Sequence, residues 1–320
     1  DNNGLNWSPV LSGPPAAGDT ATLGDAVVAA DAEVTLGVTM PELAQLDVTG
    51  GVDLVTAGFD GEAVTVNISG VGSNLIVASG TDFDNHDGGT DVTASGQLVV
   101  AGGGLYGGGE VIVDNGGIVR MEGGTLQIRR NAGDGILDLD AGSEVSGWGL
   151  IEFRDNGSLG TLLINDGALL TSRPFPDLGL RQVLTIDATD SGETTPLIDL
   201  DGRSGSGTIS LANTTTLEIL GTLTDAYSST IDMGAASILD ISQPWELGAG
   251  AVVEVDAVQL FPVAAGLFAR IAGAEVTLAG GSTVNVNSGK LEIDADLVGQ
   301  AGAVINVFDN ATLELGGTAT

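Results

Sequence analysis

Cysteine is absent from the 320 residues of the chain, and histidine occurs only once, as His86. The lack of cysteine excludes disulfide bonds, thiolate catalysis and thiolate metal ligands. A histidine-assisted nucleophile would depend entirely on His86, whose Asp and Gly neighbours form no nucleophile elbow. No phosphate-binding or dinucleotide-binding fingerprint is present either. We therefore expect that the chain is not an enzyme.

Positive charge is also scarce. Nine Lys and Arg oppose 43 Asp and Glu, which gives a formal net charge of −34. A surface with this excess of negative charge repels nucleic-acid phosphates and anionic membrane surfaces. No segment reaches the roughly 18 uninterrupted apolar residues that a membrane-spanning helix needs. We therefore expect no nucleic-acid partner and no membrane insertion.

The start and composition of the chain bear on its location. It begins at Asp1 without an initiator methionine or an apolar leader, as expected of a processed or excised piece. Cysteine-free, acidic chains rich in Gly, Asn and Thr are common among bacterial surface proteins, although a cysteine-free cytosolic protein is the alternative. The composition predicts an extracellular protein, either secreted or held at the cell surface.

Apolar residues are plentiful despite the charge. They make up 42% of the chain, while aromatic residues make up only 4%, so Val, Leu, Ile and Ala supply the core. Short runs with apolar residues at every second position recur between turn residues, as in 63–68, 135–140 and 283–287. This period of two is that of strands, and no helical period is sustained. The chain is predicted to be all-β.

The runs themselves recur with a longer period of about 21 to 22 residues. Pairs of equivalent residues at this spacing are Val52/Asn74, Leu98/Val119, Ile209/Ile231, Leu217/Leu239, Val284/Ile305 and Leu291/Leu313. Such a period matches one coil of a parallel β-helix, or β-solenoid, and about 15 coils would stack about 4.8 Å apart. The alternative is an array of β-sandwiches, which would need long strands joined by two-residue hairpin loops.

Two motifs carry a resemblance to a known group of proteins. Asn6-Trp7, followed by Gly13-Pro14-Pro15 and 18–21, resembles the N-terminal coil of bacterial surface solenoids. The repeated pattern of Gly or Asn, any residue, Leu, any residue, and Ile or Val is similar to the passenger regions of autotransporter-type adhesins. The resemblance implies a right-handed parallel β-helix that acts as an adhesin, a stalk or a matrix component.

The domain organisation follows from interruptions in the repeat. Residues 1–20 are predicted to form an N-terminal cap or an exchanged arm, and 21–320 a single β-solenoid. Loop insertions are expected near 171–182, which is rich in proline, and near 258–270, which is apolar. The second insertion either folds onto the rod or offers Phe261 and Phe268 to another subunit, and a lipid-inserting role is the third alternative, which Pro262 and Arg270 disfavour.

Basic residues are concentrated in the middle of the sequence, and none occurs before residue 120. Some are separated by about one coil and could stack on one face. They either neutralise neighbouring acids or form a docking face for an acidic end of another copy or for an anionic polysaccharide. The predicted contact residues are Arg129, Arg130, Arg154, Arg173, Arg181 and Arg203.

An acidic segment at 81–91 is the strongest candidate for a metal site. Four carboxylates lie in it with a glycine turn, and hard oxygen ligands at such spacing suit Ca²⁺. The alternative is a solvated acidic loop. The predicted calcium ligands are Asp82, Asp84, Asp87 and Asp91. Carboxylate pairs two residues apart, such as Asp138/Asp140 and Asp294/Asp296, share a strand face and could bind further ions.

Together these features predict an extracellular structural protein. We expect a homo-oligomer or filament subunit of a surface, biofilm or extracellular matrix, stabilised by calcium. The alternative is an adhesin stalk that binds glycans or a host surface. A third interpretation is a polysaccharide lyase or glycosidase, but a chain with 43 acids meets the requirement for two carboxylates trivially.

Overall fold

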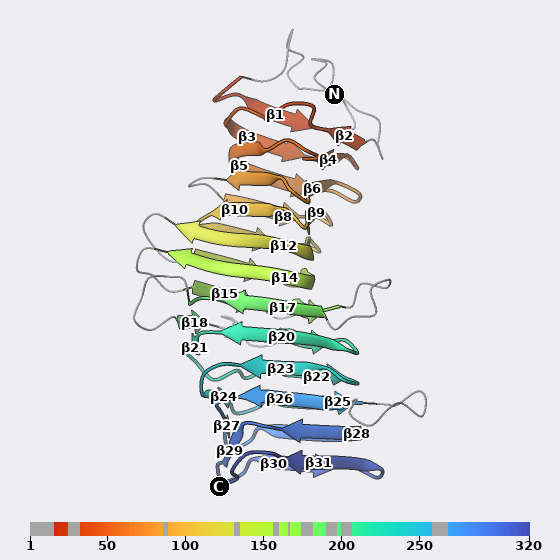
Figure 1. The fold of residues 1–320 in the computed structure, drawn as a ribbon, viewed down its shortest axis with the longest axis vertical. Coiled ribbons are helices and arrows are strands. Elements are labelled where there is room, and N and C mark those ends of the chain that lie inside the picture. Colours follow the sequence, from red (N-terminus) through yellow and green to blue (C-terminus); the bar gives the residue numbers. More distant parts are fainter. Residues whose placement is uncertain are drawn as a thin grey trace.

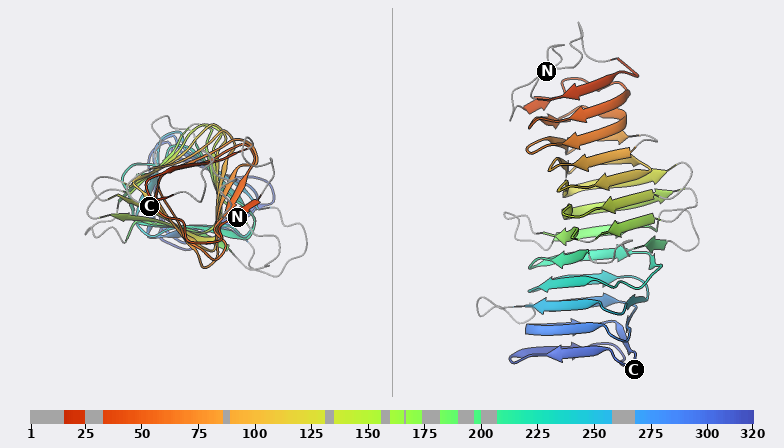
Figure 2. Two further views of the ribbon diagram at one scale, coloured as in Figure 1. Left: turned by 90° about the horizontal axis from the view of Figure 1, so that it is seen from above. Right: turned by 180° about the vertical axis from the view of Figure 1, so that it is seen from behind.

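A computed structural model shows a rod built of stacked β-strands (Figure 1). Seen from above, the successive coils lie over one another around a common axis (Figure 2). The described residues contain no helix, and so none that could cross a membrane. They are 16–24, 33–85, 89–130, 135–155, 160–165, 167–173, 182–189, 197–199, 207–257 and 268–320.

Every pairing between named strands is parallel and joins one coil to the next, which confirms the β-solenoid and excludes the hairpin sandwich. The strands fall into three stacks and a small separate sheet. Stack 1 consists of β2 (Glu33–Thr35), β4 (Asp53–Val55), β6 (Asn74–Ala78), β9 (Gln97–Ala101), β12 (Ile118–Arg130), β14 (Glu144–Asp155), β16 (Leu169–Ser172), β19 (Thr208–Leu211), β22 (Thr230–Gly234), β25 (Val252–Asp256), β28 (Thr283–Ile293) and β30 (Val304–Val307).

The second halves of the long strands β12, β14 and β28 turn into stack 2. Its other members are β7 (Asp82–Asn85), β10 (Gly104–Gly108), β17 (Gln182–Asp187), β20 (Thr215–Leu220), β23 (Ile238–Ile241), β26 (Ala269–Gly273) and β31 (Ala311–Leu315).

Stack 3 completes the coils from the N-terminal end of the rod to its middle. Its members are β1 (Thr20–Leu23), β3 (Leu43–Val48), β5 (Gly61–Ser69), β8 (Gly89–Thr93), β11 (Glu110–Val113), β13 (Gly135–Leu139), β15 (Gly160–Ile164), β18 (Leu197–Asp199) and β21 (Thr222–Leu223). The small sheet consists of β24 (Trp245–Leu247), β27 (Glu275–Leu278) and β29 (Asp296–Gly299).

The register confirms most of the predicted repeat. Five of the predicted pairs face each other in adjacent coils: Leu98/Val119, Ile209/Ile231, Leu217/Leu239, Val284/Ile305 and Leu291/Leu313. The sixth was wrong by one residue, because Asn74 pairs with Asp53 and its backbone amide donates to the carbonyl of Val52. A shift of one residue changes which face a side chain occupies.

The alternation of apolar and polar residues builds the core. In β20, Leu217 and Ile219 are fully buried, whereas Glu218 between them is half-buried on the outside. Because coils stack in register, equivalent inward residues form continuous apolar ladders along the rod. One contiguous core runs in this way from Ala21 to Leu297.

Coil length varies more than the sequence period predicted. Leu170 pairs with Ile209, and Val253 pairs with Val284, so each of these two coils is much longer than the repeat. The expectation of about 15 coils was wrong, since the described strands of stack 1 number twelve. The long coils contain the predicted insertions, whose central residues 174–181 and 258–267 lie outside the described part, as do residues 1–15 of the predicted cap or arm.

Two glycines of one coil differ in how much space surrounds them. Gly147 in β14 has φ +114°, and a Cβ there would overlap the backbone carbonyl of Met121 in the adjacent coil. Gly142, in the turn before β14, has φ +79° but open space around it. Both need the left-handed region, yet only Gly147 also permits close approach of two coils.

We therefore expect Gly147→Ala to lower the free energy of unfolding by more than about 3 kcal/mol, because backbone strain adds to a clash between coils. Gly142→Ala is the matched control and should cost only about 1–2 kcal/mol. Denaturant unfolding followed by circular dichroism measures both. Equal losses for the two variants would contradict the close packing at Gly147.

Candidate functional site

An acidic pocket lies at the N-terminal part of stack 2. Register places Glu62, Asp84 and Tyr106 in one outward-facing ladder across three coils. The carboxylate of Asp60 accepts a hydrogen bond from the backbone amide of Asp82 at 2.9 Å. The cavity measures about 330 Å³ and is lined by Thr39, Asp60, Gly61, Glu62, Asp82, Asp84 and Tyr106. Two of the four predicted calcium ligands therefore share this pocket.

Tyr106 closes one side of the acidic pocket. Its side chain folds over Gly104, where a Cβ would lie 2.9 Å from the phenol oxygen. Burial raises the pKa of Tyr106, and the charge of Asp82 and a hydrogen bond to its carboxylate raise it further. The phenol thus stays protonated and donates to Asp82 at neutral pH.

Asp91 lies apart from that pocket. It belongs to β8 in stack 3, where it faces Ile112 of β11 in register. Burial raises the pKa of Asp91, and the charges of Asp114 and Glu110 raise it further. The fourth predicted ligand, Asp87, and the neighbouring His86 lie outside the described residues.

Within the described ranges, no three Asp, Glu or His side chains are arranged to hold a metal ion. The structure thus brings Asp82 and Asp84 together but separates Asp91 from them. Other predicted carboxylate pairs find protein partners instead: the Asn165 amide donates to Asp138 at 2.7 Å and to Asp140 at 2.8 Å. Asp294 pairs with Arg270 at 3.3 Å.

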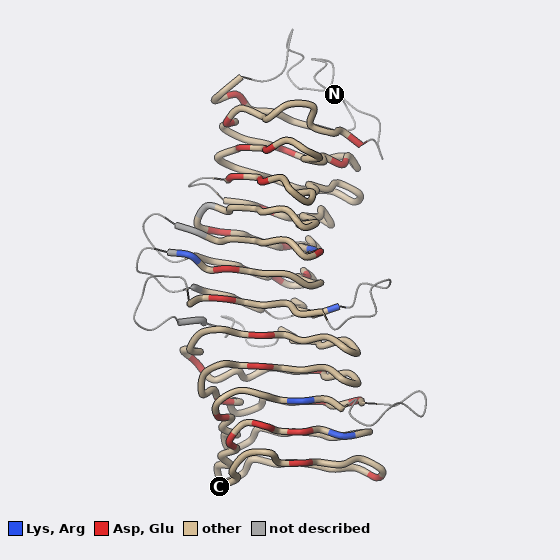
Figure 3. The backbone as a smooth tube through the Cα atoms, in the orientation of Figure 1, with Lys and Arg blue, Asp and Glu red and all other residues tan. Residues whose placement is uncertain are grey.

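Negative charge is spread along the whole rod, with few basic residues between (Figure 3). The backbone register confirms that Arg129 and Arg154 stack in adjacent coils, at the far end of stack 2. Arg130 follows Arg129 on β12, whereas Arg173 follows β16 in stack 1. Within the described part of the chain, the predicted contact arginines therefore lie in two different stacks. Arg181, Arg203 and Phe261 lie outside the described residues.

Phe268, the remaining predicted contact residue, is half-buried immediately before β26. The ammonium of Lys290 lies 4.2 Å from the centre of its ring, and Lys290 also pairs with Glu314 at 2.5 Å. Phe268 thus takes part in a contact within the rod, with a cation over its face.

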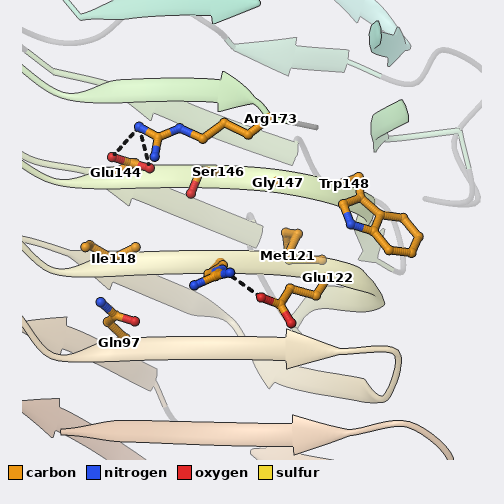
Figure 4. Close-up of a pocket in the computed structure, with 10 residues that line it drawn as sticks. Gln97, Ile118, Met121, Glu122, Glu144, Ser146, Gly147, Trp148 and Arg173 are labelled. Carbon is orange, nitrogen blue, oxygen red and sulfur yellow. Dashed lines mark hydrogen bonds and ion pairs between the residues drawn. The ribbon is translucent and has the colours of Figure 1, made fainter. Parts of the chain in front are cut away.

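A second pocket on stack 1, here called the Arg–Trp pocket, was not predicted as a site. It measures about 320 Å³ and lies across four coils (Figure 4). Its lining residues are Gln97, Ile118, Arg120, Met121, Glu122, Glu144, Ser146, Gly147, Trp148 and Arg173. Register explains the cluster, because Arg120 faces Ser146 and Glu122 faces Trp148 in the next coil.

Both arginines of the Arg–Trp pocket are paired with carboxylates. The Nε of Arg120 lies 2.7 Å from Glu122, and the Nη2 of Arg173 lies 3.2 Å from both oxygens of Glu144. Half of each arginine side chain remains exposed, at 51% and 55%. The pocket therefore combines two ion pairs that cancel in charge with guanidinium surface open to solvent.

Trp148 lies at the rim of the Arg–Trp pocket (Figure 4). Its indole packs on Gly123 of the adjacent coil, where any Cβ would overlap the ring. Its Nε1 is buried and has no acceptor among the described residues. The signal that could have revealed this cluster is the coil spacing, but the coil between Arg120 and Ser146 is longer than the predicted period.

Comparison with known proteins gives little further information. No family model and no curated protein matches the chain. One similar solved structure is titled "Crystal structure of TibC-catalyzed hyper-glycosylated TibA55-350 fragment", with 14% identity over 93% of this chain and 100% of that one. The TM-score of 0.23 is too low to support a conclusion. The resemblance to autotransporter passengers is thus supported by the solenoid fold alone.

The surroundings of Asp91 predict a pH effect. Because its pKa is raised in the folded state, its charge opposes folding at neutral pH, and this cost disappears as the pH falls through the raised pKa toward 3.8. Asp91→Asn should therefore stabilise the metal-free rod by up to about 1 kcal/mol at pH 7. The gain should vanish toward acidic pH.

Thermal unfolding in the presence of a chelator, over a pH series, tests this effect. Asp225→Asn removes the same charge at an exposed position and should change stability by less than about 0.5 kcal/mol at pH 7. A loss of stability in Asp91→Asn at pH 7 would contradict the assignment.

Proposed function

We propose that the chain is an extracellular structural protein whose rods associate end to end into surface or matrix filaments. The observation that carries the proposal is the exposure of inward-facing apolar positions in β30 and β31. Val286 is fully buried, but its partner Val307 in the last coil is 46% exposed. Likewise Ile293 is 1% exposed, but its partner Leu315 is 42% exposed.

The strands of this coil also present an unpaired edge. Among the described strands, β30 and β31 pair only with β28. Such an edge, together with exposed core positions, is a template for another coil. Among the described strands, stack 1 runs from β2 to β30, and we propose that a coil of a second copy pairs with β30 in the same parallel way. Contact of unlike ends does not close on itself and builds a filament.

Charge sets the conditions for this association. Rods that each carry a net charge of −34 repel one another, and salt screens this repulsion over about 8 Å at physiological ionic strength. Calcium would reduce the repulsion between rods more specifically than salt does, because carboxylate oxygens are its preferred ligands. We include calcium stabilisation in the proposal, with the acidic pocket at Asp82 and Asp84 as the first place to look. The proposal gives the rod no catalytic role.

The location and a second function also belong to the proposal. The acidic, cysteine-free composition supports an exterior location. A second candidate is an adhesin stalk, and the observation that favours it is the Arg–Trp pocket on the flank of the rod. The two functions are compatible, since one uses the end of the rod and the other its side.

End-to-end association can be tested at the last coil. Val307→Asp and Leu315→Asp each place a carboxylate where a second rod would bury it, which is costly without a partner. We expect wild-type rods to lengthen with rising salt or calcium and both variants to remain single. Sedimentation velocity and negative-stain electron microscopy, with calcium and then with a chelator, measure the length.

Val304→Asp is the matched control, because Val304 is 44% exposed in the same coil but occupies an outward position. It should assemble like the wild type. Single rods of wild-type protein under every condition would overturn the filament. If the rods assemble equally well with and without the chelator, calcium is not needed, but end-to-end contact between rods is still supported.

A further inference from the structure

We infer that the Arg–Trp pocket binds a neutral sugar residue of a glycan or polysaccharide on the flank of the rod. This inference goes beyond the filament and does not depend on it, because stack 1 presents the pocket sideways rather than at an end. Its chemistry follows from three features of the pocket: paired planar groups, an aromatic rim and a balanced charge.

Planar hydrogen-bonding groups line the pocket on three successive coils. Among the described contacts, Arg120 uses its Nε and Arg173 its Nη2 for the ion pairs, so further N–H groups of each guanidinium face solvent. Glu144 lies beside Arg173, and its carboxylate retains acceptor capacity (Figure 4). Neighbouring hydroxyls of a sugar ring offer the matching pair of donors and acceptors to such two-pronged groups.

Trp148 supplies an apolar surface beside these polar groups. Because the indole packs on the bare backbone of Gly123, its position is fixed before a ligand arrives. The ring is half-buried and lies at the rim, next to Gly147 and Glu122. Sugar rings carry a C–H face as well as hydroxyls, and the apolar face of an aromatic ring can pack against such C–H groups.

Charge selects a neutral sugar over an acidic one. Two carboxylates already balance the two arginines inside the pocket. Outside it, the rod carries a net charge of −34 and would repel a polyanion. The docking of an anionic polysaccharide on the arginines, left open by the sequence, is therefore disfavoured at this place. The volume of about 320 Å³ is at the lower end for small-ligand sites and suits a short stretch of a glycan.

Isothermal titration with maltotetraose, cellotetraose and mannotetraose tests the inference, with tetragalacturonate as the acidic counterpart. We expect saturable binding of at least one neutral tetrasaccharide and at least tenfold weaker binding of the acidic one. Trp148→Ala and Arg173→Gln should each weaken binding of the neutral sugar at least tenfold. Trp148→Phe keeps an aromatic ring and should lose less affinity for the sugar than Trp148→Ala. This difference separates the loss of a sugar contact from a folding defect.

Arg270→Gln is the matched control, since Arg270 is also an ion-paired arginine but lies on β26 in stack 2, several coils away from the pocket. It should bind like the wild type. Repeating the titration with Val307→Asp separates sugar binding from filament assembly. Absence of saturable binding to all three neutral sugars, stronger binding of tetragalacturonate, or equal affinity in folded Trp148→Ala and Arg173→Gln would each overturn the inference.

Discussion

Hydrogen bonding between successive coils is the constraint on which the rest of the molecule depends. It fixes the coils about 4.8 Å apart and forces each residue to lie directly over its counterpart. Inside the rod this arrangement is favourable, because apolar residues in register pack on one another, as Leu217 does with Leu239. Outside the rod the same constraint stacks like charges, and the surface has to accommodate them.

Amide and hydroxyl side chains relieve that stacking of acids. Asp47 accepts from Gln45 on its own strand and from Asn67 in the next coil, at 2.7 and 2.6 Å. Glu254 accepts from Asn285 and Asn287 at 2.8 and 2.7 Å in the same way. The Asn, Gln and Thr of the repeat therefore act as spacers between carboxylates. At Asp91, burial raises the pKa of the carboxyl group, and the charges of Asp114 and Glu110 raise it further.

The regular repeat can be predicted from the sequence, but the coils whose length departs from it cannot all be predicted. Alternation and a steady period placed Val284 over Ile305 because no insertion falls between them. The Arg–Trp pocket was missed because the coil that joins Arg120 to Ser146 is longer than the predicted period, which therefore misaligns them. Ion pairs between coils, such as Arg173 with Glu144, depend on that register and on rotamers. Asp91 lies apart from Asp82 and Asp84 because β8 pairs within stack 3, whereas β7 pairs within stack 2.

The continuous apolar core has a mechanical consequence. Each coil contacts only its neighbours, so the stability of the rod is approximately a sum of local terms and its end coils open first. The coil that contains Val307 and Leu315 leaves these two side chains partly exposed, so it costs less free energy to open than a coil with a fully buried core. If another rod pairs with the end coils, they are no longer the weakest part of the rod, and unfolding no longer starts there. Joining rods would thus slow the unravelling of every subunit without any change inside it.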